Sequence, residues 1–427
     1  MIRASTTSTI TPAARLRGQL ALPADKSIAH RALIFAALSG GPSTVIMPSP
    51  GRDVLSTLEC LRAMGVSIER LGDRHTVTGR PSRDAVLDCG NSGTTMRLLA
   101  GVAAGLPLTV SLDGDASLRT RPMERVATML RAAGAEVITT DGHAPMTVVG
   151  CASPAAATHR LPVASAQLLG AAVMAGMHAK GETTIATPGP TRDHTERMLA
   201  HLGVPIHRDG PVTTLSGPAR PRPFEMVVPG DPSAASAWLV AAALHPDAML
   251  TMVGVGLNPT RLALVGLLQR MGVDIETRFT DVSGPEPVGE MSVRGGNALR
   301  AVNVTGGEVA ELIDELPLVA VAMASVDEPS EVRDAGELRV KETDRIAAVV
   351  AGLDAIGAEV KEFPDGWRVC RGVARDALIS THGDHRIAIA FAVAGLTGVA
   401  SAVELDDPDC VAVSYPGFWH DLAAVRA

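Results

Sequence analysis

The chain has 427 residues and a formal net charge of −8, with 46% hydrophobic and 20% charged residues. This composition excludes a disordered chain and is typical of a globular protein of two or three domains. The acidic charge and the small number of aromatic residues (3 Trp, 1 Tyr, 6 Phe) disfavour a nucleic-acid-binding surface, which needs cations and stacking side chains.

Cysteine usage and the terminal sequence bear on the cellular compartment. The five cysteines are scattered and never spaced as metal-binding pairs, which favours reduced thiols and predicts no metal site. Residues 1–12 are rich in Ser and Thr and lack the apolar segment of a signal peptide, so we expect a short flexible lead. The longest uncharged stretch, residues 161–179, is interrupted by Pro162 and Gln167 and predicts a buried helix with its entry loop. We therefore expect a cytoplasmic protein without a membrane partner.

A helix end of the form Leu-x-x-x-Gly-(Val/Ala)-x-(Ile/Val) occurs five times along the chain. Its glycines follow one another at intervals of 69, 69, 69 and 85 residues: Gly65, Gly134, Gly203, Gly272 and Gly357. A glycine after an amphipathic run ends a helix, and the alternating residues beyond it begin a strand. The chain is therefore predicted to consist of repeated helix-and-strand units.

Each unit also contains a second, alanine-rich helix that begins with polar residues. Six such starts occur, at Lys26-Ser27, Asn91-Ser92-Gly93, Ser165-Ala166-Gln167, Asp231-Pro232-Ser233, Asp314-Glu315 and Asp384-His385-Arg386. The sixth amphipathic helix is predicted at residues 417–425, where no chain remains for the strand that should follow. The segment Arg15–Leu22 alternates apolar residues, and we expect this N-terminal strand to complete the sixth repeat.

The repeats divide the chain into two predicted domains of three repeats each. The first spans residues 21–229 and the second residues 1–20 plus 230–427, with two crossings near Leu20 and Pro229. Two crossing strands form a hinge, and hinges are typical of proteins that close around a ligand. We expect the active site in the cleft between the domains.

Several predicted helix starts carry cations, although the dipole of a helix favours anions at its N-terminus. Lys26 and Arg31, Arg97, and Arg386 follow three of these starts. Each cation costs about 0.3–1 kcal/mol there unless an anion offsets it. Solvent exposure of each side chain is the alternative, but the set together predicts a site for a small polyanion such as a phosphate ligand.

Two further segments carry the same mixture of charges. Arg339–Arg345 is predicted to be a helical turn, in which Lys341 and Arg345 repel while Glu342 and Arg345 can pair. Arg119 and Arg121 lie in a loop before a helix that begins at Met123. An exposed helix turn and a solvated loop remain the alternatives for these two segments.

Taken together, these motifs resemble the EPSP synthase family of 3-phosphoshikimate 1-carboxyvinyltransferases. The resemblance rests on 26–31, 90–97, 119–123, 339–345 and 383–386, and it extends in the right order from about Pro12 to the end. It implies an α/β fold, a two-domain inside-out α/β barrel of six βαβαββ repeats, three per domain, which is the enolpyruvyl transferase fold. It also implies transfer of the enolpyruvyl group of phosphoenolpyruvate to the 5-hydroxyl of shikimate 3-phosphate through a tetrahedral ketal, with release of phosphate. This chemistry requires no metal or other cofactor, and we expect a monomer.

The resemblance also implies the roles of individual residues. Asp314 accepts the hydroxyl proton, Glu342 donates a proton to the methylene carbon, and Lys26 lies between the two substrates. The residues implied for shikimate 3-phosphate are Lys26, Ser27, Arg31, Ser165, Ala166, Gln167, Arg192, Asp314 and Lys341. Those implied for phosphoenolpyruvate are Lys26, Asn91, Gly93, Arg121, Gln167, Arg345 and Arg386. For Asp314 a helix N-cap is the alternative role, and both roles can hold.

The chain departs from the family pattern at its C-terminal end, where Val413 stands in place of a lysine that contacts phosphoenolpyruvate in many members. The segment around Arg192 resembles a bacterial branch of the family that includes members tolerant of the inhibitor glyphosate. Gly93, in contrast, leaves room for glyphosate, so we expect intermediate sensitivity to this inhibitor. Two other functions are the alternatives. A UDP-N-acetylglucosamine enolpyruvyl transferase has a reactive cysteine in a loop that contains none here, at 114–119. A non-catalytic phosphate-ligand binder would not need Asp314, Lys341, Glu342 and Arg345 together.

Overall fold

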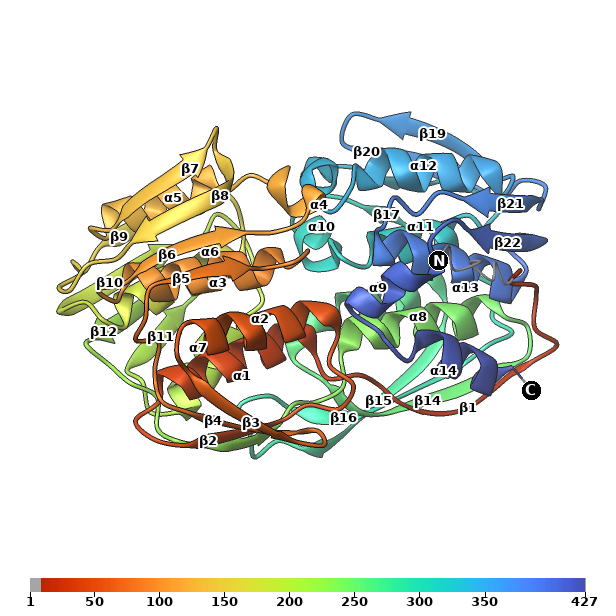
Figure 1. Ribbon diagram of the computed structural model, residues 1–427. Helices are drawn as coiled ribbons and strands as arrows, with labels where there is room; N and C mark the ends of the chain where they lie inside the picture. Colours follow the sequence, from red (N-terminus) through yellow and green to blue (C-terminus); the bar gives the residue numbers. More distant parts are fainter. Residues whose placement is uncertain (1–8, 427) are drawn as a thin grey trace, which may run out of the picture. The chain divides into compact units, whose positions relative to one another are not determined.

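The computed structural model describes residues 9–426, which form two compact units (Figure 1). The N-terminal unit contains Ala24–Pro229 and Val282–Glu286, and the C-terminal unit contains the chain up to Pro23, Gly230–Asp281 and the chain from Pro287 onward. The expectation of two crossings is therefore incomplete, because the chain leaves the C-terminal unit for residues 282–286 and then returns to it. The start of the N-terminal unit is likewise Ala24, not residue 21.

The N-terminal unit consists of three repeats of the order βαβαββ. The first repeat comprises β13 (Glu225–Val227), α1 (Lys26–Leu38), β2 (Ser43–Ile46), α2 (Arg52–Ala63), β3 (Ser67–Leu71) and β4 (Arg74–Thr78). The second comprises β5 (Ala85–Asp88), α3 (Gly93–Ala104), β6 (Thr109–Asp113), the short α4 (Ala116–Arg119), α5 (Glu124–Ala132), β7 (Glu136–Thr140) and β8 (His143–Val149). The third comprises β9 (Thr158–Arg160), α6 (Ala166–Gly176), β10 (Gly181–Ala186), α7 (His194–His201), β11 (Ile206–Asp209) and β12 (Val212–Gly217).

The C-terminal unit follows the same plan, and its last repeat is shortened. The fourth repeat comprises β1 (Leu16–Ala21), α8 (Pro232–Leu244), β14 (Ala248–Gly256), η1 (Pro259–Arg261), α9 (Ala263–Met271), β15 (Asp274–Asp281) and β16 (Val288–Arg294). The fifth comprises β17 (Asn303–Val304), α10 (Gly307–Leu312), α11 (Leu316–Met323), β18 (Ser330–Val332), η2 (Gly336–Val340), α12 (Arg345–Ala355), β19 (Glu359–Phe363) and β20 (Gly366–Cys370). The sixth comprises β21 (Asp376–Ile379), α13 (His385–Thr397), β22 (Ala402–Leu405), η3 (Pro408–Val413) and α14 (Phe418–Val425).

Every repeat forms its own sheet. In five of them the strands lie in the order first, second, fourth, third, with the first pair parallel and the others antiparallel. The sixth sheet contains only the parallel pair β21–β22. Five sheets of this order and the shortened sixth bear out the predicted α/β fold class.

The assignment of the N-terminal strand to the sixth repeat is wrong. β1 pairs in parallel with β14, from Leu16 opposite Ala248 to Ala21 opposite Val253, and so opens the fourth repeat. The sixth sheet receives only a single antiparallel bridge, in which Ile10 and Val403 exchange two hydrogen bonds of 2.8 and 2.9 Å. Backbone pairing does not depend on side-chain identity, so an apolar alternating strand fits any sheet with a free edge.

The predicted flexible lead lies mainly outside the described residues, and the part that is described is ordered. Residues 1–8 are not described, whereas Ile10 is buried in the core of the C-terminal unit. The side chain of Ile10 therefore belongs to the fold, and the expectation of a flexible lead is wrong for this residue.

Local sequence explains where the helices begin and end. The side chains of Asp25, Ser92, Ser165, Asp231 and Asp384 each accept a hydrogen bond from a backbone N–H in the first turn of the alanine-rich helix that follows. Such a cap is worth about 1 kcal/mol. The five repeated glycines all have φ between 82° and 101°, the left-handed conformation that glycine adopts at low cost and that ends a helix.

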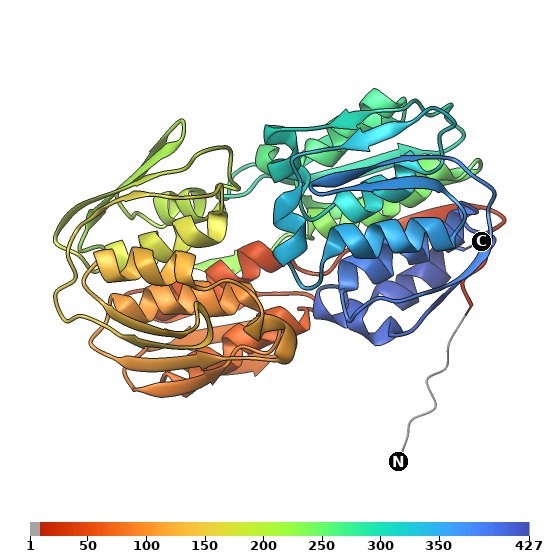
Figure 2. The same cartoon turned by 90° about the horizontal axis from the view of Figure 1, so that it is seen from above.

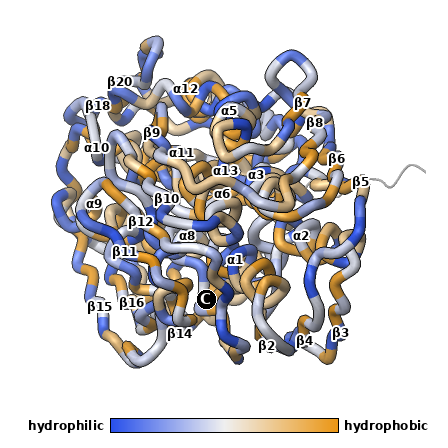
Figure 3. Tube along the Cα trace, turned by 90° about the vertical axis from the view of Figure 1, so that its left-hand side faces the viewer, coloured by the Kyte–Doolittle hydropathy of each residue, from blue (hydrophilic) through white to orange (hydrophobic). Residues whose placement is uncertain are grey.

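The alanine-rich helices lie inside the units and the sheets lie around them. α3 packs closely on α6 in one unit, and α8, α11 and α13 pack on one another in the other (Figures 1 and 2). Small side chains allow this close approach: a Cβ atom added to Gly101 would lie 2.4 Å from the backbone oxygen of Ala171. Along outer strands such as β8, buried residues alternate with more exposed ones. Figure 3 shows the hydropathy of each residue along the chain.

Candidate functional site

The implied site residues of the N-terminal unit gather at the N-terminal ends of its central helices. Lys26 and Ser27 begin α1, Gly93 begins α3, and Ala166 and Gln167 begin α6 (Figure 1). Arg121 lies between α4 and α5, and Arg192 lies just before α7. Free backbone N–H groups at such helix ends favour bound anions.

Lys26 is held by a carboxylate that the sequence analysis did not identify. Its Nζ lies 3.0 Å from Oδ2 of Asp53, which is buried in the first turn of α2. The pair offsets the cost of a cation at the start of α1 and fixes the ammonium group in one place. Only the contact between α1 and α2 distinguishes Asp53 from the other carboxylates of the sequence.

Asn91 and Arg121 form a short polar network. Arg121 Nη2 donates to Asn91 Oδ1 at 2.5 Å, and Asn91 Nδ2 donates to Asp115 Oδ2 at 2.7 Å. Asp115 also caps the short helix α4, so the network joins the loop before α3 to that helix. The buried guanidinium of Arg121 is thereby oriented.

A second network joins α3 to α6 beside Gly93. Arg97 Nη1 donates to Gln167 Oε1 at 2.6 Å, and Gln167 Nε2 donates to Thr94 Oγ1 at 2.9 Å. A Cβ atom on Gly93 would lie 2.9 Å from Nη1 of Arg97 and 3.3 Å from Nη1 of Arg121. Glycine at this position therefore leaves room for both guanidinium groups.

Arg31 brings three other elements together. Its Nε donates to Thr195 Oγ1 at 2.7 Å, Nη1 to the backbone oxygen of Ser27 at 2.8 Å, and Nη2 to that of Ala166 at 3.2 Å. The pKa of Arg31 is lowered to about 10, mainly by burial; nearby carboxylates oppose this shift and the charge of Arg192 contributes to it. Arg31 therefore remains a cation at neutral pH, and the positive charge of Arg192 acts on its guanidinium group.

The implied residues of the C-terminal unit gather around Arg345. This side chain is 2% exposed, and its Nε lies 2.8 Å from Asp384 Oδ2. Its Nη2 lies 2.6 Å from Glu342 Oε2, and its Nη1 lies 3.7 Å from Asp314 Oδ1. Burial disfavours the charge of Arg345, but the carboxylates of Asp384, Glu342 and Asp314 outweigh it and raise the pKa of the guanidinium. The expected Glu342–Arg345 ion pair is present.

Asp314 lies near two cations. Its Oδ2 is 3.9 Å from Nη2 of Arg386, and its Oδ1 is 3.7 Å from Nη1 of Arg345. Asp314 is in the turn between α10 and α11, and the N-cap of α11 is Glu315, so the N-cap alternative for Asp314 is not observed. Its carboxylate is partly exposed and thus accessible to a ligand.

The segment 341–344 is not helical, contrary to the expectation for Arg339–Arg345. It connects η2 to α12, which begins at Arg345 after the N-cap Asp344. The side chain of Asp344 accepts from the backbone N–H of Ala347, which starts the helix later than expected. Burial lowers the pKa of Lys341, and the carboxylate of Asp314 opposes this shift. The negative charge of Asp314 therefore acts on Lys341.

Arg386 lies beside a buried carboxylate, Glu315, to which neither the motifs nor the resemblance assigned a role in the site. Glu315 Oε1 lies 3.8 Å from Nη1 of Arg386 and also accepts a hydrogen bond from Ser233. Arg261 Nη2 donates to Ser233 Oγ at 2.8 Å and to Asp231 Oδ1 at 3.1 Å. Asp231 and Ser233 begin α8, a predicted helix start, but nothing in the sequence connects that start with Arg386. Val413, at the departure from the family pattern, ends η3.

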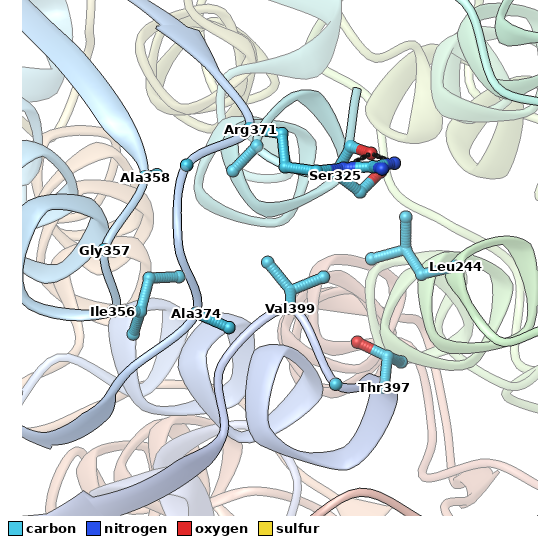
Figure 4. Close-up of a pocket in the computed structure, with 12 residues that line it drawn as sticks. Leu244, Ser325, Ile356, Gly357, Ala358, Arg371, Ala374, Thr397 and Val399 are labelled. Carbon is cyan, nitrogen blue, oxygen red and sulfur yellow. Dashed lines mark hydrogen bonds between the residues drawn. The ribbon is translucent and has the colours of Figure 1, made fainter. Parts of the chain in front are cut away.

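A cavity of about 290 Å³ lies at the other ends of the central helices of the C-terminal unit. Leu244, Ala324 and Thr397, at or just past the ends of α8, α11 and α13, contribute to its lining. Figure 4 shows Arg371 reaching Ser325, whose backbone oxygen accepts from Nε of Arg371 at 2.8 Å. The cavity contains none of the implied site residues.

Two kinds of feature are absent from residues 9–426. No group of three or more His, Cys, Asp or Glu side chains is arranged to hold a metal ion there. Over the same residues, no helix combines the length and the hydrophobicity needed to cross a membrane.

Comparison with known proteins agrees with the fold and with the motifs. Residues 10–422 match the family model described as EPSP synthase (3-phosphoshikimate 1-carboxyvinyltransferase). The chain is 44% identical to the 3-phosphoshikimate 1-carboxyvinyltransferase of Herpetosiphon aurantiacus, covering 98% of this chain and 99% of that protein. It is 46% identical to the protein of the same name from Roseiflexus castenholzii, covering 96% and 98%.

Solved structures give the same result. EPSP synthase from Acinetobacter baumannii is 34% identical, with a TM-score of 0.85 over 98% of each chain. The enolpyruvyl transferase NikO from Streptomyces tendae shares the fold at 19% identity, with a TM-score of 0.77 over 98% of this chain and 96% of that one. The predicted fold class and the resemblance are confirmed, and the chain belongs to the EPSP synthase family.

Proposed function

We propose that the protein is a 3-phosphoshikimate 1-carboxyvinyltransferase, which transfers the enolpyruvyl group of phosphoenolpyruvate to the 5-hydroxyl of shikimate 3-phosphate and releases phosphate. The observation that carries the proposal is the arrangement around Arg345. Asp314 lies 3.7 Å from Arg345 and 3.9 Å from Arg386, and Glu342 lies 2.6 Å from Arg345. Two acid–base groups beside two cations suit proton transfer on an anionic substrate.

The N-terminal unit supplies most of the cations that bind the substrates. Ser27, Arg31 and Arg192 hold shikimate 3-phosphate, with its phosphate at the start of α6, where Ser165, Ala166 and Gln167 lie. Asn91, Gly93 and Arg121 bind phosphoenolpyruvate together with Gln167, and Lys26 contacts both substrates. The networks through Asp115, Thr94 and Thr195 hold these groups in place before a ligand arrives, which lowers the entropic cost of binding.

The C-terminal unit supplies the acid–base groups. In the addition step, the 5-oxygen forms a bond to C2 of phosphoenolpyruvate, its proton passes to Asp314, and Glu342 donates a proton to the methylene carbon. In the elimination the Glu342 carboxylate takes back a proton from the new methyl group, the bond from C2 to the phosphate oxygen breaks, and the leaving phosphate takes the proton held by Asp314. Lys341 orients the 5-hydroxyl, and Arg345 and Arg386 bind phosphoenolpyruvate, because an arginine fork matches a carboxylate or a phosphate.

Residues of both clusters take part in this one reaction. The protein acts as a cytoplasmic monomer on small-molecule substrates, and its five cysteines are free thiols, as in a reducing compartment. Neither a metal nor another cofactor takes part.

The test is a phosphate-release assay with both substrates. We expect steady release with shikimate 3-phosphate and phosphoenolpyruvate. Asp314→Asn should lower turnover by about two to four orders of magnitude while leaving shikimate 3-phosphate binding largely intact. Arg386→Ala should mainly weaken phosphoenolpyruvate binding. Release with UDP-N-acetylglucosamine in place of shikimate 3-phosphate, and none with the proposed pair, would contradict the proposal.

A further inference from the structure

The hairpin β15–β16 belongs to the C-terminal unit, but its tip belongs to the N-terminal unit. β15 ends at Asp281 and β16 begins at Val288, while Val282–Glu286 pack with the N-terminal unit. In that tip, Oε1 of Glu286 lies 2.7 Å from Nδ1 of His194. The two side chains are 4% and 1% exposed, although 92 residues separate them in the sequence.

His194 is the first residue of a helical turn that three successive contacts fix. His194 itself meets Glu286, and the next residue, Thr195, accepts the hydrogen bond of Arg31 at 2.7 Å. The carboxylate of Glu196 then accepts from Arg208 and from Thr213, each at 3.2 Å. The position of Thr195 relative to Arg31 therefore depends on where the first turn of α7 is held.

A hairpin tip has no need to bury a carboxylate for its own stability. Burial of an ionised group is costly unless a partner compensates it, and tips are normally exposed. The negative charge of Glu286 also acts on Arg31: burial lowers the pKa of Arg31, and Glu286 is one of the carboxylates that oppose the shift. Glu286 thus lies within electrostatic reach of a cation that we assign to substrate binding.

We infer that Glu286 is a positioning residue for the shikimate 3-phosphate site: it holds His194 at the start of α7 and thereby keeps Thr195 against Arg31. This inference rests on the proposed function. Glu286, at the hairpin tip that belongs to the N-terminal unit, thus supports a binding site of that unit through His194 and Thr195 and not by contact with the substrate.

The experiment compares steady-state constants of three variants with the wild type. Glu286→Ala should raise the KM for shikimate 3-phosphate about tenfold, the scale of one lost buried hydrogen bond, with kcat and the KM for phosphoenolpyruvate within twofold of the wild type. Glu286→Gln keeps an oxygen and an N–H for His194 and should restore the KM to within about threefold. Glu290→Gln, which removes the exposed 2.6 Å pair with Arg278 in the same hairpin, is the matched control and should behave as the wild type.

Thr195→Val probes the same contact from its other end and covers the case in which Glu286→Ala does not fold. It should raise the same KM, and the double variant Glu286→Ala/Thr195→Val should add little to either single change, because both act on one contact. An unchanged KM for shikimate 3-phosphate in Thr195→Val, equal increases of both KM values, or additive effects would overturn the inference. A wild type that is inactive on the substrate pair would overturn the proposed function and this inference with it. If the wild type is active but the variants give one of the three results just named, the inference alone is overturned.

Discussion

Replacement of Arg345 by methionine should destabilise the C-terminal unit strongly. The side chain of Arg345 is 2% exposed, and its positive charge compensates three carboxylates. These belong to the fully buried Asp384, 2.8 Å away, to Glu342, 2.6 Å away, and to Asp314, 3.7 Å away. Removing one partner of a buried ion pair costs about 3–5 kcal/mol, since the remaining charge is left without compensation. Folded proteins have about 5–15 kcal/mol of stability, so this loss would be a large fraction of the total.

Tryptophan fluorescence in urea reports this unit selectively. All three tryptophans, Trp238, Trp367 and Trp419, belong to the C-terminal unit, and the first two are buried. The variant should therefore unfold at a clearly lower urea concentration in this signal. Arg278→Met, which removes an exposed ion pair of the same unit, is the control and should leave the midpoint unchanged.

A second substitution tests the cause of the loss. Asp384→Asn still caps α13, since an amide oxygen can accept from the backbone N–H of Arg386, but it removes one uncompensated charge. Added to Arg345→Met, it should recover part of the stability, with a coupling energy of about 0.5–3 kcal/mol. A loss below about 1 kcal/mol for Arg345→Met, or full additivity of the two changes, would refute the reasoning.

Three further substitutions test other parts of the fold. Nδ1 of His30 lies 2.6 Å from the Thr57 hydroxyl, and Thr57→Val removes this partner. The free energy of unfolding, measured by circular dichroism in urea, should fall by about 1–3 kcal/mol. Thr57→Ser keeps the hydroxyl and should retain the stability. Gly101→Ala would place a Cβ atom 2.4 Å from the backbone oxygen of Ala171 and should lower stability by at least about 1–3 kcal/mol; wild-type stability would mean that α3 and α6 are not in such close contact. Burial lowers the pKa of His178 to about 4. Between pH 4 and 6.5 the unfolded chain therefore binds more protons than the folded protein. The free energy of unfolding should fall with falling pH in this range, by about 1.4 kcal/mol per pH unit. His178→Gln should lose that part of the acid sensitivity, and identical pH profiles of the two proteins would contradict the assignment.

Local patterns in the sequence determined the helices. Each of the five Leu-x-x-x-Gly segments ends a helix at a glycine with positive φ, and polar residues at four of the six predicted alanine-rich starts cap their helices. The first of these helices is capped by Asp25, one residue before its predicted start. Both signals act within one helical turn, so a single sequence contains all the information that they need. The motifs at three of these helix starts, together with 119–123 and 339–345, were sufficient to identify the family.

The tertiary structure alone decided which segments meet. It placed β1 beside β14 instead of in the sixth sheet, brought the tip of the β15–β16 hairpin to His194, and set Asp53 against Lys26. Strand edges offer the same hydrogen-bonding groups whatever their sequence, and a carboxylate has no local signature of the cation that it will meet. Capping and turn chemistry can be read from neighbouring residues, whereas these pairings depend on the packing of segments far apart in the chain.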